Sequence, residues 1–187
     1  IQKAREFGEL YFDGPREYGY GGYIYDGRWK QVAKDFANYY NLKKGNRVLD
    51  IGCGKGFLVK DFFDIGIDAY GLDISEYAIK KSPEEIKNRL ILGSAEQLPF
   101  SDSSFDLVIS INTLHNLSRD KCKKAIREIN RVSKKNSYIQ IDSYYTPEQK
   151  EIFEDWVLTA VFHCYPEEWI DLFKEVNYKG DYNWTIV

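Results

Sequence analysis

The feature that most constrains the fold is a glycine-rich turn, VLDIGCGKG, at residues 48–56. Apolar residues typical of a buried strand precede it, and the residues after it have the spacing of a helix. Glycine permits the positive φ angles and the close approach of a ligand to the backbone that such a loop needs. The turn therefore predicts a βα unit whose helix N-terminus presents unpaired N–H groups to a ligand.

The rest of the chain alternates strands with helices, which predicts a doubly wound α/β sheet. We expect six to seven mostly parallel strands with helices on both faces. The expected strands are 47–51, 68–74, 89–92, 105–111, 137–143 and 182–187. The expected helices are 28–41, 56–64, 75–88 with an interruption at 82–83, 118–132, one from 147, and 166–176. A length of 187 residues suits one domain. Within it we expect an irregular arm at 1–27, a cofactor-binding core at 28–143, and substrate-side helices with a last strand at 144–187.

Charge and cysteine usage narrow the possible partners and locations. With 26 basic and 29 acidic residues the net charge is −3, which argues against a dedicated nucleic-acid binder. No apolar run approaches the roughly 20 residues that span a bilayer, and no stretch resembles a signal peptide. The three cysteines include no C-x-x-C, so we expect neither disulfides nor a metal site, and a cytoplasmic location. Because the chain starts at Ile1 and has no Met, we expect a short N-terminal piece to be missing.

The spacing of the turn indicates its ligand. A dinucleotide fingerprint is G-x-G-x-x-G, which seats a pyrophosphate, whereas here Phe57 follows Gly56. The observed D-x-G-x-G-x-G places Asp50 two positions before Gly52. A carboxylate there would repel a pyrophosphate and attract an ammonium or sulfonium cation. The alternative is a tight turn without a ligand, which three spaced glycines and an acid make the less favoured interpretation.

Polar residues follow three other expected strands on the same edge. Asp73 lies 23 residues after Asp50, roughly where an acid accepts hydrogen bonds from ribose hydroxyls in doubly wound sheets. Its alternative role is to cap the next helix, although Ser75 could do so itself. Residues 93–96 follow the third strand, where an adenine would be held, and Asn112 follows the fourth.

The motifs VLDIGCGKG, GLDIS, GSAEQLPFSDSSFDLVIS and INTLHNL, in this order, resemble the class I S-adenosylmethionine-dependent methyltransferases. The similarity is closest to the small-molecule group typified by ubiquinone- and menaquinone-biosynthesis methyltransferases, and it covers roughly residues 28–143. It implies a Rossmann-like fold, S-adenosylmethionine as cofactor, S-adenosylhomocysteine as product, and in-line methyl transfer to an oxygen or nitrogen of a small molecule. The cofactor-binding residues it implies are Asp50, Gly52, Cys53, Gly54, Gly56, Asp73, Ile74, Ser94, Ala95, Glu96 and Asn112.

Two positions depart from the family pattern. Ser94 stands where many members carry Asp, so we expect a backbone contact to the adenine there. The family's sheet usually ends in an antiparallel pair, but this chain has clear sequence for one final strand only. We therefore expect a reduced end of the sheet.

A base is needed only if the methyl acceptor must lose a proton. His115, in INTLHNL on the ligand edge, is the candidate catalytic base, and its alternative is a histidine that only packs or bonds locally. Cys53 is interpreted as a small filler, because no feature places a base beside it. The candidate substrate or lid residues are Tyr20, Tyr23, Arg28, Tyr144 and His163, and for Tyr144 a place in the lid core is equally expected.

The aromatic residues gather in the flanks, with 11 of the 30 in residues 1–40, 7 in 41–135 and 12 in 136–187. We therefore expect the two flanks to meet over the pocket and to exclude water.

Three other functions remain as alternatives: a non-catalytic S-adenosylmethionine-binding or scaffold protein, an RNA methyltransferase and a nicotinamide dehydrogenase. Phe57 in place of the fingerprint's spacing argues against the last. Methyltransferases that act on nucleic-acid amino groups or on protein glutamine carry Asp/Asn-Pro-Pro-Tyr/Phe where this chain has SINT, at 110–113. The absence of that motif argues against those substrates. The expected partner is a small molecule, with neither nucleic acid nor a membrane.

Overall fold

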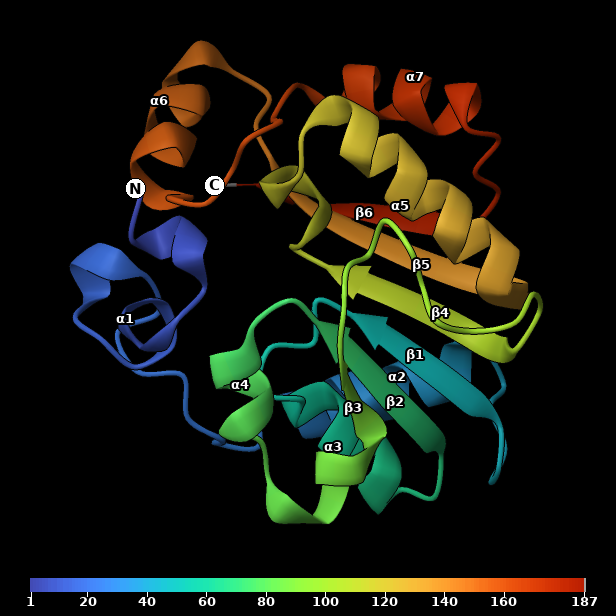
Figure 1. The fold of residues 1–187 in the computed structure, drawn as a ribbon. Coiled ribbons are helices and arrows are strands. Elements are labelled where there is room, and N and C mark those ends of the chain that lie inside the picture. Colours follow the sequence, from blue (N-terminus) through green and yellow to red (C-terminus); the bar gives the residue numbers. More distant parts are fainter. Residues whose placement is uncertain (187) are drawn as a thin grey trace.

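A single sheet of six parallel strands, in the order β3-β2-β1-β4-β5-β6, runs through the middle of the molecule (Figure 1). The structure is a computed structural model that describes residues 1–186. The strands are β1 (Arg47–Ile51), β2 (Asp68–Asp73), β3 (Leu90–Leu92), β4 (Phe105–Ile111), β5 (Ser133–Ser143) and β6 (Asp181–Ile186). The predicted doubly wound parallel sheet is thus confirmed. Because the order reverses between β1 and β4, the carboxyl ends of these strands flank a switch point, where such folds bind ligands.

Helices cover both faces of the sheet (Figure 1). One face carries α2 (Trp29–Tyr39), α3 (Phe57–Asp64) and α4 (Glu76–Lys80), and the other carries α5 (Arg119–Val132) and α7 (Pro166–Glu175). Each face has its own apolar core. The β4 sequence FDLVISI contributes to both, Val108 to one and Leu107 to the other, which explains its continuous apolar run.

Most expected element boundaries lie within one or two residues of the observed ones. The interruption expected at 82–83 in the helical stretch 75–88 is confirmed: α4 is followed by a 3₁₀ helix at Glu84–Arg89, because Pro83 cannot donate a helical hydrogen bond. Strand β5 begins at Ser133 rather than at 137, pairing with β4 across a register shift between Phe105 and Leu107. The last strand begins at Asp181, and its expected final residue, Val187, lies outside the described residues.

The sheet ends on β6 alone, which pairs in parallel with β5. Within residues 1–186 every pair of neighbouring strands is parallel, and the reduced end of the sheet stays a prediction. No helix in the same range is long and apolar enough to cross a membrane.

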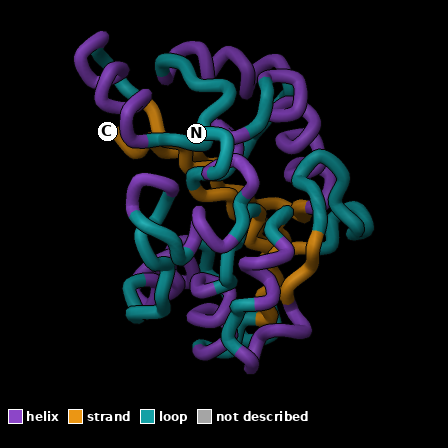
Figure 2. The backbone as a smooth tube through the Cα atoms, turned by 60° about the vertical axis from the view of Figure 1, so that its left-hand side comes forward, coloured by secondary structure: helices purple, strands orange, loops and turns teal. Residues whose placement is uncertain are grey.

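The N-terminal arm, residues 1–27, crosses the carboxyl edge of the sheet beside α6 (Pro147–Trp156). It contains α1 (Glu9–Phe12) and 3₁₀ turns at Ala4–Glu6 and Arg16–Tyr18. Figure 2 shows the strands as one continuous band with helices on either side of it. The Arg5 guanidinium donates to the carbonyl of Ala160 at 2.6 Å, so the two aromatic-rich flanks meet as expected.

Candidate functional site

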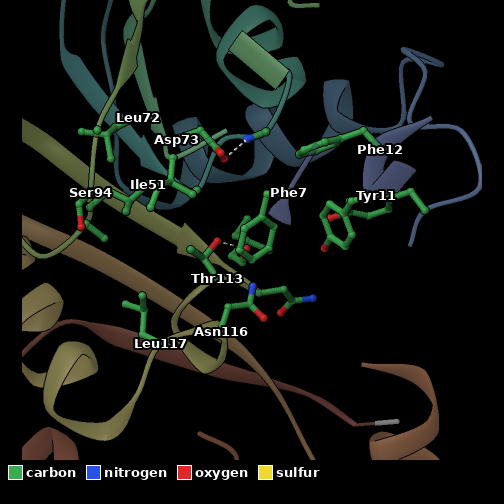
Figure 3. Close-up of a pocket in the computed structure, with 18 residues that line it drawn as sticks. Phe7, Tyr11, Phe12, Ile51, Leu72, Asp73, Ser94, Thr113, Asn116 and Leu117 are labelled. Atoms are coloured by element: carbon green, nitrogen blue, oxygen red, sulfur yellow. Dashed lines mark hydrogen bonds between the residues drawn. The ribbon is translucent and has the colours of Figure 1, made fainter. Parts of the chain in front are cut away.

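A cleft lies at the carboxyl ends of β1, β2 and β4, beneath the arm (Figure 3). Its empty volume, open mouth included, is about 780 Å³. In Figure 3, Phe7 and Tyr11 reach from the arm toward Asp73 and Asn116. The predicted site residues that line the cleft are Gly52, Gly54, Asp73, Ile74, Ser94, Ala95, Asn112 and Tyr20.

The glycine turn forms one wall of the cleft with its backbone. Gly52, Gly54 and Gly56 have φ angles of 78°, 55° and 77°, which disfavour any residue with a Cβ. A Cβ at Gly52 would also overlap the side chain of Thr113, at the end of β4. Gly56 is the N-cap of α3, and no side chain caps this helix. The turn therefore offers bare backbone and a helix N-terminus to a ligand.

Asp73 connects the glycine turn to the next helix. Its two carboxylate oxygens accept hydrogen bonds from the N–H groups of Gly54 at 2.7 Å and Ser75 at 2.8 Å. Burial raises the pKa of this carboxyl, while the backbone hydrogen bonds lower it. Ser75 caps α4 itself, accepting from the N–H of Ala78 at 3.0 Å. Each oxygen of Asp73 retains a lone pair for a ligand hydroxyl.

Asp50 lies beneath the turn, 6% exposed. Burial, and next the charge of Asp73, raise its pKa to about 7. No ion pair within residues 1–186 includes Asp50, so a ligand ammonium would supply the cation that favours its ionised form. The residues that line the cleft do not include Asp50.

Three other predicted cofactor residues also lie outside the lining: Cys53, Gly56 and Glu96. The Cys53 thiol is buried, and burial raises its pKa, which agrees with its interpretation as a filler. Glu96 forms an ion pair with Lys121 at 3.1 Å instead.

A lysine that sequence reasoning missed fastens the arm to the turn. Lys55, 6% exposed, lies between Gly54 and Gly56. Its Nζ is 2.6 Å from Oδ1 of Asp13 and 2.8 Å from the carbonyl oxygen of Tyr23. The hydroxyl of Tyr77 also donates to Asp13, at 2.7 Å. No local pattern marks this contact, because Asp13 and Lys55 are far apart in sequence.

The other lid candidates divide into two groups. The ring of Tyr20 lies 4.6 Å from that of Tyr23, which stacks on Phe57 at 4.8 Å, so both belong to the closed arm. Arg28 is exposed, pairs with Asp26 at 2.6 Å, and does not line the cleft.

His115 is buried behind the cleft rather than in its wall. The side chain is 2% exposed, and burial lowers its pKa to about 3, so the ring is neutral at pH 7. Its Nε2 is 3.8 Å from Oδ2 of Asp142, and its Nδ1 has no hydrogen-bond partner among residues 1–186. The next residue, Asn116, lines the cleft and has a buried Oδ1 that also lacks a partner.

Asp142, which sequence reasoning also missed, lies near the end of β5. Burial raises its pKa to about 6. Its charge, together with that of Asp73, adds to the burial that raises the pKa of Tyr11 in the cleft wall. Asp142 is therefore a titratable group near Tyr11 of the cleft wall, and it is not itself one of the lining residues.

Tyr144 and His163 belong to a small core beneath α6. The Tyr144 hydroxyl is 3.0 Å from Nδ1 of His163, and both rings pack on Phe153. Neither residue lines the cleft. This position corresponds to the lid-core alternative for Tyr144.

Comparison with known proteins agrees with the geometry of the cleft. Residues 49–141 match the family model described as a methyltransferase domain. The uncharacterized methyltransferase YcgJ of Bacillus subtilis is 33% identical over 117 residues, which are 58% of this chain and 45% of that protein. Its crystal structure superposes with a TM-score of 0.63 at 23% identity, covering 78% of this chain and 67% of that one.

Two other relatives carry more specific names. A demethylmenaquinone methyltransferase of Renibacterium salmoninarum is 31% identical over 121 residues, 64% of this chain and 49% of the relative. A tRNA (carboxymethyluridine(34)-5-O)-methyltransferase of Arabidopsis thaliana is 31% identical over 148 residues, 76% of this chain and 34% of the relative. The matches thus span less than half the length of each of these three curated relatives. The family match, the parallel sheet and the glycine turn together show that this chain belongs to the S-adenosylmethionine-dependent methyltransferases.

Proposed function

We propose that the chain transfers a methyl group from S-adenosylmethionine to an oxygen or nitrogen of a small molecule. The observation that carries this proposal is the cover over the cleft. Phe7, Tyr11 and Tyr20 of the arm line it, and the ion pair between Lys55 and Asp13 ties the arm to the glycine turn. A covered cleft suits a small acceptor better than a folded polymer.

The residues present fit the cofactor. Asp50 is a buried carboxyl without a cation, matched to the ammonium of the methionine part. Asp73 keeps free lone pairs for the ribose hydroxyls, and Ser94 and Ala95 line the cleft for the adenine. S-adenosylmethionine supplies a methyl group already activated on a sulfonium, so the protein mainly orients the acceptor and excludes water.

We assign Asp142, rather than His115 itself, as the base that accepts a proton from the methyl acceptor. At pH 7 a carboxyl with a pKa of about 6 is largely ionised and can accept a proton. The neutral ring of His115, 3.8 Å away, then serves as a positioning residue for that carboxylate. Asn116 offers its unpartnered Oδ1 to the acceptor from the cleft wall.

The test is a labelling experiment with S-adenosylmethionine that carries a tritiated methyl group. The protein is incubated with a metabolite extract or with total tRNA. The tRNA is separated by size, and small-molecule products are separated from unreacted S-adenosylmethionine by chromatography before label is counted. We expect label in a small-molecule product, and much less of it in Asp73→Ala.

The demethylmenaquinone methyltransferase relative favours this outcome, whereas the tRNA methyltransferase relative provides the competing one. Label in the tRNA would overturn the small-molecule acceptor. Binding of S-adenosylhomocysteine without a labelled small-molecule product or labelled tRNA would favour a non-catalytic binding protein.

A further inference from the structure

A second hollow lies beside the cofactor cleft, between α2 and the strands β5 and β6. Its empty volume, including its open side, is about 1510 Å³. We call it the aromatic groove, because Trp29, Phe36 and Tyr138 line it along its length. Ile111 and Asn112 line both hollows. A molecule in the groove therefore lies next to the cleft, separated from it only by the end of β4.

The walls of the groove have the chemistry of a site for flat rings. The rings of Phe36 and Tyr138 meet edge to face at 5.0 Å, and Tyr40 lies parallel to Phe36 at 6.2 Å. Fixed aromatic walls of this kind bind planar molecules through ring contacts.

The charged groups of the groove are all acidic. Asp35 and Asp181 line it, and among residues 1–186 its lining includes no Lys, Arg or His. An anionic ligand would lie next to carboxylates without a counter-charge, whereas a cationic or neutral one would be favoured. Rings of Trp and Tyr also attract cations through their faces. The groove thus selects by charge against phosphates and carboxylates.

A line of polar side chains leads from the groove to the cleft. The Tyr138 hydroxyl donates to Oε1 of Gln140 at 3.0 Å, and Nε2 of Gln140 donates to the Thr185 hydroxyl at 2.9 Å. Thr185 in turn donates to Oδ1 of Asn112 at 3.4 Å. Asp142 pairs in register with Thr185 and its carboxyl is hydrogen-bonded to the Thr185 side chain, so this carboxyl adjoins the line without lining either hollow. A polar group on a bound ring can be directed toward that carboxyl.

We infer that the aromatic groove binds the methyl acceptor and that the acceptor is a planar aromatic compound with an amino group. This assignment rests on the proposed function, since it names the substrate of the same reaction. Transfer to the neutral amine forms a C–N bond from the nitrogen lone pair and leaves the electron pair of the broken C–S bond on sulfur. The remaining proton goes to Asp142.

The test is a calorimetric titration with two probes of the same ring and opposite charge at pH 7, 4-aminoquinoline and quinoline-4-carboxylate. We expect the amine to bind at least tenfold more tightly than the carboxylate. The variant Asn183→Lys places a cation in the groove lining at an exposed position of β6. It should weaken binding of the amine at least tenfold and leave the affinity for S-adenosylhomocysteine within twofold of that of the unaltered protein.

The matched control is Asn88→Lys, the same change at an exposed residue near β3, on the opposite edge of the sheet. It should alter neither affinity. Equal binding of the two probes, no binding of either, or an amine affinity that Asn183→Lys leaves unchanged would overturn the groove assignment alone. Failure of the unaltered protein to bind S-adenosylhomocysteine would instead overturn the proposed function.

Discussion

The cofactor cleft and the aromatic groove share the end of β4, but they are built from different parts of the polypeptide. Much of the cleft wall is backbone. It includes the glycines with positive φ angles and the N–H groups that donate hydrogen bonds to Asp73. The groove is formed by side chains from α2, β5 and β6, which lie far apart in sequence. A backbone site depends on a few positions that tolerate no change. A side-chain site can be altered gradually, which suits the part that selects the acceptor.

The largest expected effect comes from closing the backbone site at Gly52. In Gly52→Ala a Cβ would both occupy a positive φ and overlap Thr113. We expect S-adenosylhomocysteine to bind at least 100-fold more weakly, as measured by calorimetry. The affinity of the groove for the amine probe should fall much less.

Gly45→Ala is the matched control for backbone strain. Gly45 has a φ of 85°, but a Cβ there would meet nothing within 4 Å. Both variants incur the cost of a left-handed conformation, about 1–2 kcal/mol. If Gly45→Ala weakened ligand binding as much as Gly52→Ala, the overlap with Thr113 would not be the cause of the weaker binding.

The second effect tests whether Asp73 serves the ligand as well as the turn. Asp73→Ala removes charge-assisted hydrogen bonds, each worth about 1.5–3 kcal/mol, and also releases the N–H groups of Gly54 and Ser75. We expect S-adenosylhomocysteine to bind more than tenfold more weakly. An unchanged calorimetric affinity would refute the ribose assignment.

The third effect is a pH dependence from Asp50. Burial raises its pKa in the free protein to about 7, above the unfolded value of 3.8, so this group stabilises the fold at low pH and loses that contribution as the pH rises toward 7. A ligand ammonium favours the ionised form. Affinity for S-adenosylhomocysteine should therefore rise about tenfold between pH 6 and 8.

The variant Asp50→Asn provides the control, because an amide does not titrate in this range. Its affinity should change little from pH 6 to 8. A pH dependence that persists in this variant would assign the titration to another group.

The difference between the two hollows also explains what the sequence could predict. The turn, Asp73 and the strand ends follow from local patterns, and the structure brings Gly52, Gly54 and Asp73 to one cleft. The place of Asp142 depends on the register of β5 with β6, which no short motif encodes. The Phe105–Leu107 shift moves every later partner along β5 and is likewise invisible in the sequence.

His115 illustrates the same limit. Its position after β4 indicates the ligand edge, as it does for Asn116, which lines the cleft. Only the packing against Phe153 beneath α6 decides that the ring is buried. The aromatic excess of the flanks was informative about where the chain covers the cleft, but the sequence could not tell the wall residues Phe7 and Tyr11 from core residues such as Tyr144.

The smallest expected effect concerns the N-terminal arm, which a side-chain ion pair holds against the backbone wall of the cleft. Asp13→Asn weakens the partly buried ion pair with Lys55, whereas Asp26→Asn removes an equally short but exposed pair with Arg28 in the same arm. Exposed pairs contribute little, because solvent screens them. We expect Asp13→Asn to lower the affinity for S-adenosylhomocysteine about three- to fivefold and to speed proteolysis of the arm, and Asp26→Asn to do neither. If both variants bound like the unaltered protein, the arm would not hold the ligand, and the cleft would depend on its backbone wall alone.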